Sequence, residues 1–202
     1  MHINYKIHEN LARECFINKP VFIYVNKFDE EGLFRFQKDF RKAQKSKQEI
    51  IPLIIDSYGG DVYSLFGMIS LVKTSSVPVA TIIPSKAFSC GAVLASAGTP
   101  GKRYISPYGS ILVHQISIGE EGKMSEVQSS LDYAEKLNKA LLSMLDENCG
   151  KEAGFFAKHI KSLANVDFYL KPKEAKKIGL VDHIGIPVLS VEVSQKISLS
   201  SK

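Results

Sequence analysis

The sequence predicts an α/β domain whose sheet is largely parallel. Two observations lead to this fold class. Short β-branched and aromatic runs alternate with segments of helical periodicity, an order that places helices between parallel strands. The 202 residues, 45% of them hydrophobic and 23% charged, are enough for one ordinary domain with a substantial core. The same composition excludes a wholly disordered chain and a disulfide scaffold.

The first half of the chain carries the clearest alternation. Apolar runs bounded by turn residues indicate strands, and Asp29 offers an N-cap to an amphipathic helix with Leu33, Phe36 and Phe40 at helical spacing. Residues 84–88 read as a connection between a strand and a helix of small residues that opens at Ser89. We therefore expect strands at 19–27, 50–56 and 77–83, and helices at 29–47, 61–73 and 89–98.

The second half is dominated by one long helical pattern. Strands are expected at 102–105 and 110–115, and shorter helices at 153–163 and 172–178. Between them, an apolar stripe from Met124 to Met144 predicts a helix over about 123–149, roughly 26 residues or ~39 Å long. That is long for a domain of this size, so we expect part of it to project and pack against another subunit. The Ser/Lys-rich residues 194–202 read as a frayed tail.

Charge and cysteine usage limit the classes of function. The formal net charge of +5 comes from 26 Lys+Arg against 21 Asp+Glu, a mixed surface with no stacking aromatics, so no nucleic-acid partner is expected. Three scattered cysteines (Cys15, Cys90 and Cys149) suit a reducing compartment and argue against a metal cluster. A polar N-terminus and the lack of a long apolar run predict a cytoplasmic protein with no membrane span.

Two turns from a strand into a helix carry the candidate chemistry. Gly59-Gly60 forms the first turn, and Ser89-Cys90-Gly91 the second. Helix N-termini present unpaired N–H groups that stabilise a developing anion, and glycine lets the backbone approach a ligand closely. Ser89, with small neighbours, would expose its hydroxyl, and Gly60 could supply a second N–H. These are the parts of an acyl-transfer site, a nucleophile with an oxyanion hole.

Each of these features also has a plain structural explanation. A Gly-Gly pair after a strand is usually a turn, and a serine that opens a helix is usually its N-cap. His114 lies in an apolar strand, where most histidines are core residues with satisfied hydrogen bonds. Asp167 precedes a short apolar run and reads as a cap or turn residue. From the pattern alone, these explanations outweigh a catalytic one for each residue singly.

The order of the motifs, taken together, resembles the ClpP family of serine peptidases. Gly60 and Ser89 are 29 residues apart, and Ser89 and His114 are 25 apart, which is the spacing of that family. The resemblance covers about residues 19–187, and the wording of its motifs resembles most the divergent ClpP-like proteases carried by phages. The matching segments are 55–60 (IDSYGG), 86–92 (KAFSCGA), 97–104 (AGTPGKRY), 113–115 (VHQ), 167–170 (DFYL) and 174–182 (EAKKIGLVD).

The resemblance implies a role for each site residue. Ser89 would be the nucleophile, His114 the general base and then acid, and Asp167 the group that orients His114. The backbone N–H groups of Gly60 and Cys90 would form the oxyanion hole, which leaves the Cys90 thiol incidental. A polypeptide substrate would bind as an added strand, held mostly by main-chain hydrogen bonds. The residues expected to line that strand are Gly59, Asp61, Val62, Gln115 and Ile116.

The resemblance also implies an architecture. The fold would be of the ClpP/crotonase type, built from repeated ββα units over residues 19–193, with the long helix as a handle between two stacked heptameric rings. The subunit itself would need no cofactor or metal, and ATP would enter only through a partner Clp-type ATPase.

Three departures from the family pattern qualify these expectations. Residues 1–18 do not match the segment that lines the axial pore, which puts the ATPase partner in doubt. Ile116 stands where a proline usually follows His-Gln. The chain between Gly150 and Asp167 is about one helical turn longer than usual, and Asp182 is the other carboxylate nearby.

Four other functions remain open from the sequence. A signal-peptide-peptidase enzyme of the SppA kind would use a lysine base, for which Lys73, Lys86 and Lys102 are candidates. An inactive ClpP-like scaffold subunit would build rings without catalysis, although such subunits lose triad residues. A crotonase-type acyl-CoA enzyme shares the fold but needs no serine nucleophile, and basic charge alone leaves nucleic-acid binding as a weak option.

Overall fold

The main sheet of the protein is parallel throughout. A computed structural model describes residues 20–117, 119–163 and 167–190. Its larger sheet has five strands in the order β1-β2-β3-β5-β8, and every neighbouring pair is parallel. The strands are β1 (Ile23–Val25), β2 (Ile51–Ile55), β3 (Val79–Ile83), β5 (Arg103–Ile105) and β8 (His183–Ile184). The α/β class expected from the sequence is confirmed.

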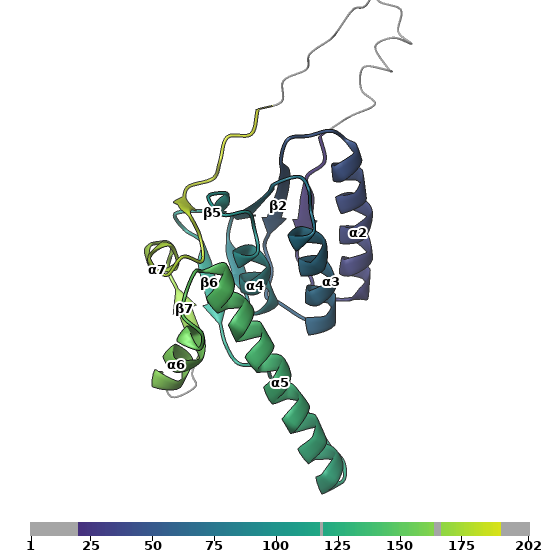
Figure 1. Ribbon diagram of the computed structural model, residues 1–202, viewed down its shortest axis with the longest axis vertical. Coiled ribbons are helices and arrows are strands. Elements are labelled where there is room, and N and C mark those ends of the chain that lie inside the picture. The colour runs from purple at the N-terminus through teal and green to yellow at the C-terminus, as the bar shows by residue number, and fades with distance from the viewer. Residues whose placement is uncertain (1–19, 118, 164–166, 191–202) are drawn as a thin grey trace, which may run out of the picture.

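The helices pack around this sheet (Figure 1), and α2 shows how the sequence sets their ends. Asp29 caps α2, because its Oδ1 accepts a hydrogen bond of 2.7 Å from the N–H of Gly32. Phe36 and Phe40 stack on each other with ring centroids 5.4 Å apart and are buried in the core. The described helices are α2 (Glu30–Lys45), α3 (Val62–Lys73), α4 (Cys90–Ser96), α5 (Met124–Asn148), α6 (Phe155–Ser162) and α7 (Pro172–Lys177).

A second, smaller sheet lies beside the first. It contains β4 (Lys86–Phe88), β6 (Ser110–Val113) and β7 (Phe168–Leu170), with β4 parallel and β7 antiparallel to β6. The expectation that residues 84–88 only connect a strand to a helix is therefore wrong. A three-residue strand leaves no alternating pattern in the sequence, and pairing with β6 is what makes this segment extended.

The two sheets are joined by the repeated ββα units that the sequence led us to expect. In the first unit β3 belongs to the main sheet, β4 to the small sheet, and α4 follows. In the second unit β5 and β6 are divided in the same way before α5. As a result, the second strand of each unit runs directly into a helix or loop at one end of the small sheet. Ser89 and His114 follow β4 and β6 at that end.

The long helix α5 is divided between the core and solvent. Its buried residues, Leu141, Leu142, Leu145 and Asp146, all lie in its C-terminal third, and the rest extends away from the domain (Figure 1). Met124 is 89% exposed and Leu131 43% exposed. Only the C-terminal end of the apolar stripe that extends to Met144 therefore packs against the protein's own core.

Both ends of the chain, including the predicted N-terminal segment 1–18 and tail 194–202, lie outside the described residues. In the part of the chain that the structure describes, no helix is both long and apolar enough to cross a membrane.

Candidate active site

Ser89 lies at a strained turn between β4 and α4. Its φ of 55° and ψ of −120° lie in a region that residues with a side chain rarely adopt. The N–H of Ser89 donates to the carbonyl of Leu112 over 2.9 Å, which continues the β4–β6 pairing to the serine and holds the turn. The Ser89 hydroxyl makes no capping hydrogen bond to α4, so the N-cap explanation does not account for it. A sharp turn of this kind presents a serine oxygen outward.

Gly59 lies against Ser89, and the turn at Ser89 is possible because Gly59 has no side chain. A Cβ on Gly59 would be 2.7 Å from the Cβ of Ser89 and 3.2 Å from its Oγ, closer than carbon atoms approach in proteins. Gly59 also has a φ of +108°, a conformation that favours glycine. The Gly-Gly turn is thus more than a change of direction, since it makes room for the serine.

The turn at Gly60 and the start of α4 at Cys90 carry the two expected oxyanion-hole donors. Gly60 forms a bridge with Phe28, and the N–H of Asp61 donates to the Phe28 carbonyl over 2.7 Å, which fixes the backbone there. Within the described residues, no carbonyl or side-chain oxygen accepts a hydrogen bond from the N–H of Gly60 or Cys90. Both lie on the wall of one cavity with Ser89.

The thiol of Cys90 connects the start of α4 to the turn at Gly60. Its Sγ donates to the Gly60 carbonyl over 3.2 Å, and the side chain is buried. Burial raises the pKa of the Cys90 thiol to about 11, so the group is protonated at neutral pH. The thiol is therefore a hydrogen-bond donor that ties Gly60 to α4, a contact that the sequence did not indicate.

His114 and Asp167 approach each other from β6 and β7. Val113 pairs with Phe168 in the antiparallel register, and continuing that register by one residue sets His114 opposite Asp167. Among the described residues, no hydrogen bond or ion pair joins the His114 ring to Ser89 or to Asp167. His114 is half-buried and lines the same cavity as Ser89, whereas Asp167 is exposed and lies outside that wall.

The cavity that contains Ser89 and His114 has a volume of about 280 Å³. Its polar groups lie at one side, and apolar side chains from α3, α4, β6 and α5 form the rest. Those side chains are Val62, Val93, Val113, Leu141, Leu142 and Leu145. Such a cavity suits an uncharged side chain of moderate size beside the serine.

The residues expected to bind a substrate strand divide into two groups. Val62, Gln115 and Ile116 line the cavity, and Asn138 on α5 holds the Ile116 N–H through a hydrogen bond of 3.1 Å. Gly59 and Asp61 instead shape the turn. The Asp61 N–H is occupied by Phe28, and its carboxylate caps α3 by accepting from the N–H of Ser64 over 2.6 Å.

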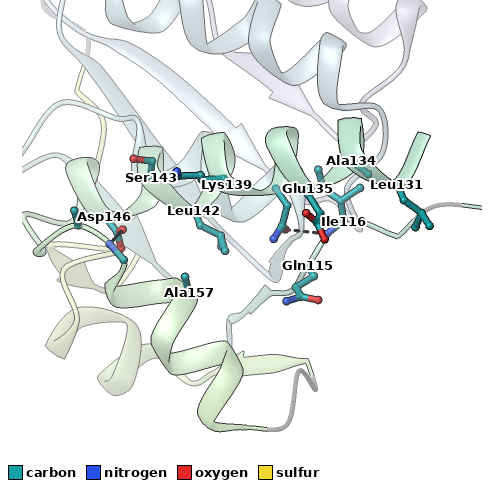
Figure 2. A pocket seen from close by; sticks show the side chains of 13 residues that line it. Gln115, Ile116, Leu131, Ala134, Glu135, Lys139, Leu142, Ser143, Asp146 and Ala157 are labelled. Carbon is teal, nitrogen blue, oxygen red and sulfur yellow. Dashed lines mark hydrogen bonds between the residues drawn. The ribbon is translucent and has the colours of Figure 1, made fainter. Parts of the chain in front are cut away.

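A second and larger cavity adjoins the first through Gln115, Ile116 and Leu142. It has a volume of about 640 Å³ and lies between α5 and α6 (Figure 2). Asp146 forms part of its wall, where the buried carboxylate accepts from the N–H groups of Gly154 and Phe156 over 2.7 and 3.0 Å. Those two bonds cap the start of α6 and account for the charge of Asp146 there.

The three candidate lysine bases have other partners or lie elsewhere. Lys86 Nζ is 2.8 Å from Asp56 Oδ1, and this hydrogen bond raises the pKa of the ammonium group against the opposing effect of burial. Lys73 Nζ donates to the side chain of Asn148. Neither these two nor Lys102 lines the cavity with Ser89.

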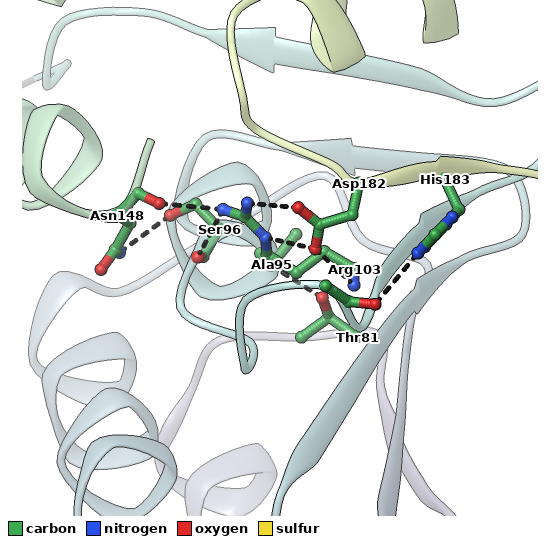
Figure 3. A network of polar contacts seen from close by, with 8 residues as sticks. Thr81, Ala95, Ser96, Arg103, Asn148, Asp182 and His183 are labelled. Carbon is green, nitrogen blue, oxygen red and sulfur yellow. Dashed lines mark hydrogen bonds and ion pairs between the residues drawn. The ribbon is translucent and has the colours of Figure 1, made fainter. Parts of the chain in front are cut away.

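Asp182 is engaged away from this cavity (Figure 3). The guanidinium of Arg103 donates to its two carboxylate oxygens over 2.9 and 2.6 Å, and the Arg103 N–H adds a third bond of 3.0 Å. Partial burial raises the pKa of Asp182, but these bonds lower it by more, so the pKa lies below the ordinary value. Asp182 therefore holds the turn after α7 against β5.

Comparison with known families agrees with this geometry. The family model of the Clp proteases matches residues 36–187, three-quarters of the chain. The chain belongs to the Clp protease family. Membership makes it a ClpP-like serine peptidase in general terms, and members of the Clp protease family usually form oligomeric rings. The match is to the family as a whole, so the likeness to phage-borne members stays a prediction.

Sequence reasoning missed the apolar wall of this Clp protease site. Leu141 was part of the predicted stripe on α5 and Leu145 lies one residue beyond it, yet both line the cavity of Ser89. Their spacing of four residues was visible, but the sequence held no sign of where the helix leaves the core. Tyr58 also lines the cavity and was not singled out from the sequence.

Proposed function

We propose that this Clp protease is a serine endopeptidase that cleaves unfolded or small polypeptides through an acyl-enzyme. The observation that carries the proposal is the environment of Ser89. Its hydroxyl makes no capping bond at a strained turn, and it shares a cavity with His114 and with the N–H groups of Gly60 and Cys90. Strain of this kind persists where the surrounding structure holds it and is concentrated at functional sites.

In the acylation step, Ser89 Oγ attacks the carbonyl carbon of the scissile peptide bond while His114 takes the hydroxyl proton. The negative charge that develops on the carbonyl oxygen is stabilised by the N–H groups of Gly60 and Cys90. His114 then gives its proton to the departing amine, the C–N bond breaks, and an ester of Ser89 remains. Asp167, opposite His114 in the β6–β7 register, stabilises the imidazolium and one ring tautomer.

In the deacylation step, His114 takes a proton from water, and the water oxygen attacks the ester carbonyl. The C–O bond to Ser89 breaks, and the proton returns to the serine oxygen. Substrate lies as an added strand between the segment from Gly60 to Val62 and the segment from Gln115 to Ile116. Main-chain recognition of this kind tolerates many sequences.

Assembly into rings belongs to the same proposal. The N-terminal two-thirds of α5 carries exposed apolar side chains, such as Met124 and Leu131, that contact no core of the chain's own. A second copy of the subunit is the proposed partner, in heptameric rings that stack in pairs around a chamber. A Clp-type ATPase would bring ATP to the complex, and the subunit itself carries the peptidase chemistry without a cofactor.

Two alternative functions remain and can be distinguished. An SppA-like enzyme with a lysine base is disfavoured by the placement of Lys73 and Lys86 with other partners. An inactive scaffold subunit is disfavoured because Ser89, His114 and Asp167 are all present. The pH dependence of ester hydrolysis distinguishes the SppA-like alternative from the proposed enzyme. A histidine base gives an inflection near pH 6.5, and a lysine base gives one at higher pH.

The test of the function is the intact mass after treatment with a fluorophosphonate. We expect one adduct on Ser89 in the wild type and none in Ser89→Ala. Ser85→Ala is the matched control, since Ser85 is an exposed serine four residues earlier in the same segment. An adduct that persists in Ser89→Ala would show that another residue is the nucleophile.

A further inference from the structure

Three aromatic side chains form an exposed row beside the candidate active site. Tyr58, Phe88 and Tyr169, called here the aromatic row, come from three segments far apart in the sequence. The rings of Tyr58 and Phe88 have centroids 5.9 Å apart at an interplanar angle of 70°. Those of Phe88 and Tyr169 are also 5.9 Å apart, at 90°.

The strand register explains why these rings meet on one face. Phe88 pairs with Leu112 in β6, and Leu112 pairs with Tyr169 in β7. The side chains of these paired strand residues therefore lie on the same side of the small sheet. The bridge between Ser57 and Ala87 places Tyr58 next to Phe88 on that side. The row therefore crosses the small sheet next to the end where Ser89 and His114 lie.

The row remains open to solvent although it is aromatic. Tyr58 is 75% exposed and Tyr169 58% exposed, whereas Phe88 between them is half-buried. On one side the Lys86 ammonium lies 4.4 Å from the centre of the Tyr58 ring, and Asp56 neutralises it. Contiguous exposed aromatic surface of this kind indicates a binding site for apolar groups.

We propose that the aromatic row binds aromatic or large apolar side chains in the leaving-group half of the substrate. The inference rests on the proposed function and extends it to a substrate preference. One observation, together with the proposed binding mode, names the occupant. Tyr58 lines the same cavity as Ser89, so the row is continuous with the reacting centre. In the proposed mode we assign the acyl half of the substrate to the segment from Gly60 to Val62, which leaves the aromatic row to the leaving-group half.

The acyl-enzyme permits a direct test with a defined position. A short N-acyl amino-acid methyl ester has no peptide on its leaving side, and it acylates Ser89 with release of methanol. An added dipeptide amide then competes with water. Its amino nitrogen attacks the ester carbonyl, a new peptide bond forms, and Ser89 recovers its proton. The ratio of peptide product to free acid measures how well the added amine occupies the leaving-group side.

We expect Phe-Phe-amide to be used roughly five to ten times better than Gly-Gly-amide by the wild type, a ratio typical of one aromatic contact. In Tyr169→Ala this preference should fall close to one, and Tyr169→Phe should restore it because the ring is kept. Tyr108→Ala is the matched control, because Tyr108 is 95% exposed and outside the row. If Tyr169→Ala does not fold, Tyr169→Leu removes the ring while it keeps an apolar strand residue.

The possible outcomes distinguish a failure of the inferred substrate preference from a failure of the proposed peptidase function. Ester hydrolysis with equal use of the two amides by the wild type overturns the inference alone. A preference for Phe-Phe-amide over Gly-Gly-amide that is as large in Tyr169→Ala as in the wild type also overturns the inference alone. A smaller particle in sedimentation for Tyr169→Ala, with the preference unchanged, would assign the row to a contact between subunits and overturn it as well. If the wild type hydrolyses no ester, the proposed function fails and the inference falls with it.

Discussion

Asp167 faces His114 across the end of the small sheet, because each is the first residue beyond the Val113–Phe168 pair of β6 and β7. This relationship makes Asp167 the candidate orienting carboxylate. We expect Asp167→Asn to lower the turnover of small peptides by up to about four orders of magnitude, because the wrong tautomer of His114 would be favoured. Turnover should be measured on particles whose assembly matches the wild type.

Asp182→Asn is the matched comparison. Asp182 binds Arg103 away from the cavity, so this variant should retain most of its turnover per folded molecule. Near-full activity in Asp167→Asn would contradict the assignment and leave a Ser89–His114 pair as the machinery.

The Arg103–Asp182 pair should make stability depend on pH in a defined direction. Hydrogen bonds from Arg103 hold the pKa of Asp182 below its ordinary value in the folded protein, despite the opposing effect of partial burial. The pair therefore stabilises the fold at neutral pH, and this contribution is lost as the pH falls below about 4 and the carboxylate is protonated. Asp182→Asn should cost roughly 2–3 kcal/mol at pH 7 and progressively less in acid.

Urea titrations of the two proteins at pH 7, 5 and 3.5 measure this difference. A gap in unfolding free energy that is constant over the series would mean that the charge of Asp182 does not contribute.

Gly59 should be essential for the serine and not merely for the turn. Gly59→Ala places a methyl group 2.7 Å from the Cβ of Ser89, so the hydroxyl must shift. Because a displacement of about 1 Å can cost 100-fold in rate, fluorophosphonate labelling of Ser89 should slow by at least tenfold. Labelling rates and thermal unfolding should be followed together.

Gly101→Ala is the control that distinguishes the effect of backbone strain from the effect of a steric contact with Ser89. Gly101 has a φ of +81°, but a Cβ there meets nothing within 4 Å. Both variants should lose about 1–2 kcal/mol of stability from strain, and only Gly59→Ala should slow labelling. Equal slowing in both would show that strain alone is responsible.

The sequence predicted the long elements of the fold because they leave periodic patterns. The bounds of α2, α3 and α5 differ from those expected by two residues or fewer at each end, and Asp29 was predicted as the cap of α2. The short strands β4, β7 and β8 were not predicted, since they are defined by their partners and not by their own residues, whereas the three-residue strands β1 and β5 lie within predicted strands. Missing β4 and β7 also hid the register that places Asp167 opposite His114.

In the candidate site too, residues that belong to sequence motifs were predicted, whereas contacts between residues far apart in the sequence were not. Ser89, His114, Gly60 and Cys90 were predicted from motif order, because the resemblance supplies their spacing along the chain. The Arg103–Asp182 pair, the Cys90–Gly60 contact and the aromatic row join residues from 30 to more than 100 positions apart. Such contacts depend on how the sheets are aligned, and no single segment encodes them.

Cys90 and Cys149, the two free cysteines of the described residues, should be inert to alkylation. Burial raises the pKa of Cys90 to about 11 and that of Cys149 to about 12, so almost no thiolate exists at pH 7.5. Peptide mapping after N-ethylmaleimide should show both unmodified in the native protein and both modified in guanidinium chloride. Rapid native modification of Cys90 would mean that its thiol is open and does not bind the Gly60 carbonyl.

The same thiol can be tested as a positioning group. Cys90→Ser keeps a donor toward Gly60, and Cys90→Ala removes it. Ester turnover should fall several-fold in the alanine variant and recover in the serine variant, with KM little changed, because the contact acts on the oxyanion donors. Equal turnover in the alanine variant and the wild type would show that Gly60 is held by Phe28 alone.

The projecting part of α5 should be required for assembly. Leu131 is 43% exposed and Leu137, six residues closer to the core on the same stripe, is half-buried, so a contact with another chain would complete the burial of both. Leu131→Glu with Leu137→Glu would bury two unpaired charges at such a contact, which is strongly unfavourable. Sedimentation should then show single rings or monomers. Lys136→Glu, an exposed charge change on the same helix, is the control for altered net charge.

Activity should follow assembly in the same samples. Leu141, Leu142 and Leu145 at the other end of α5 line the cavity of Ser89, so a helix freed from its contact can shift that wall. Peptide turnover per subunit should therefore fall in the double variant while thermal unfolding of the core stays near the wild-type value. Unchanged sedimentation in the double variant would exclude a contact through this part of α5. Full turnover in dissociated subunits would show instead that the cavity holds its form without the particle.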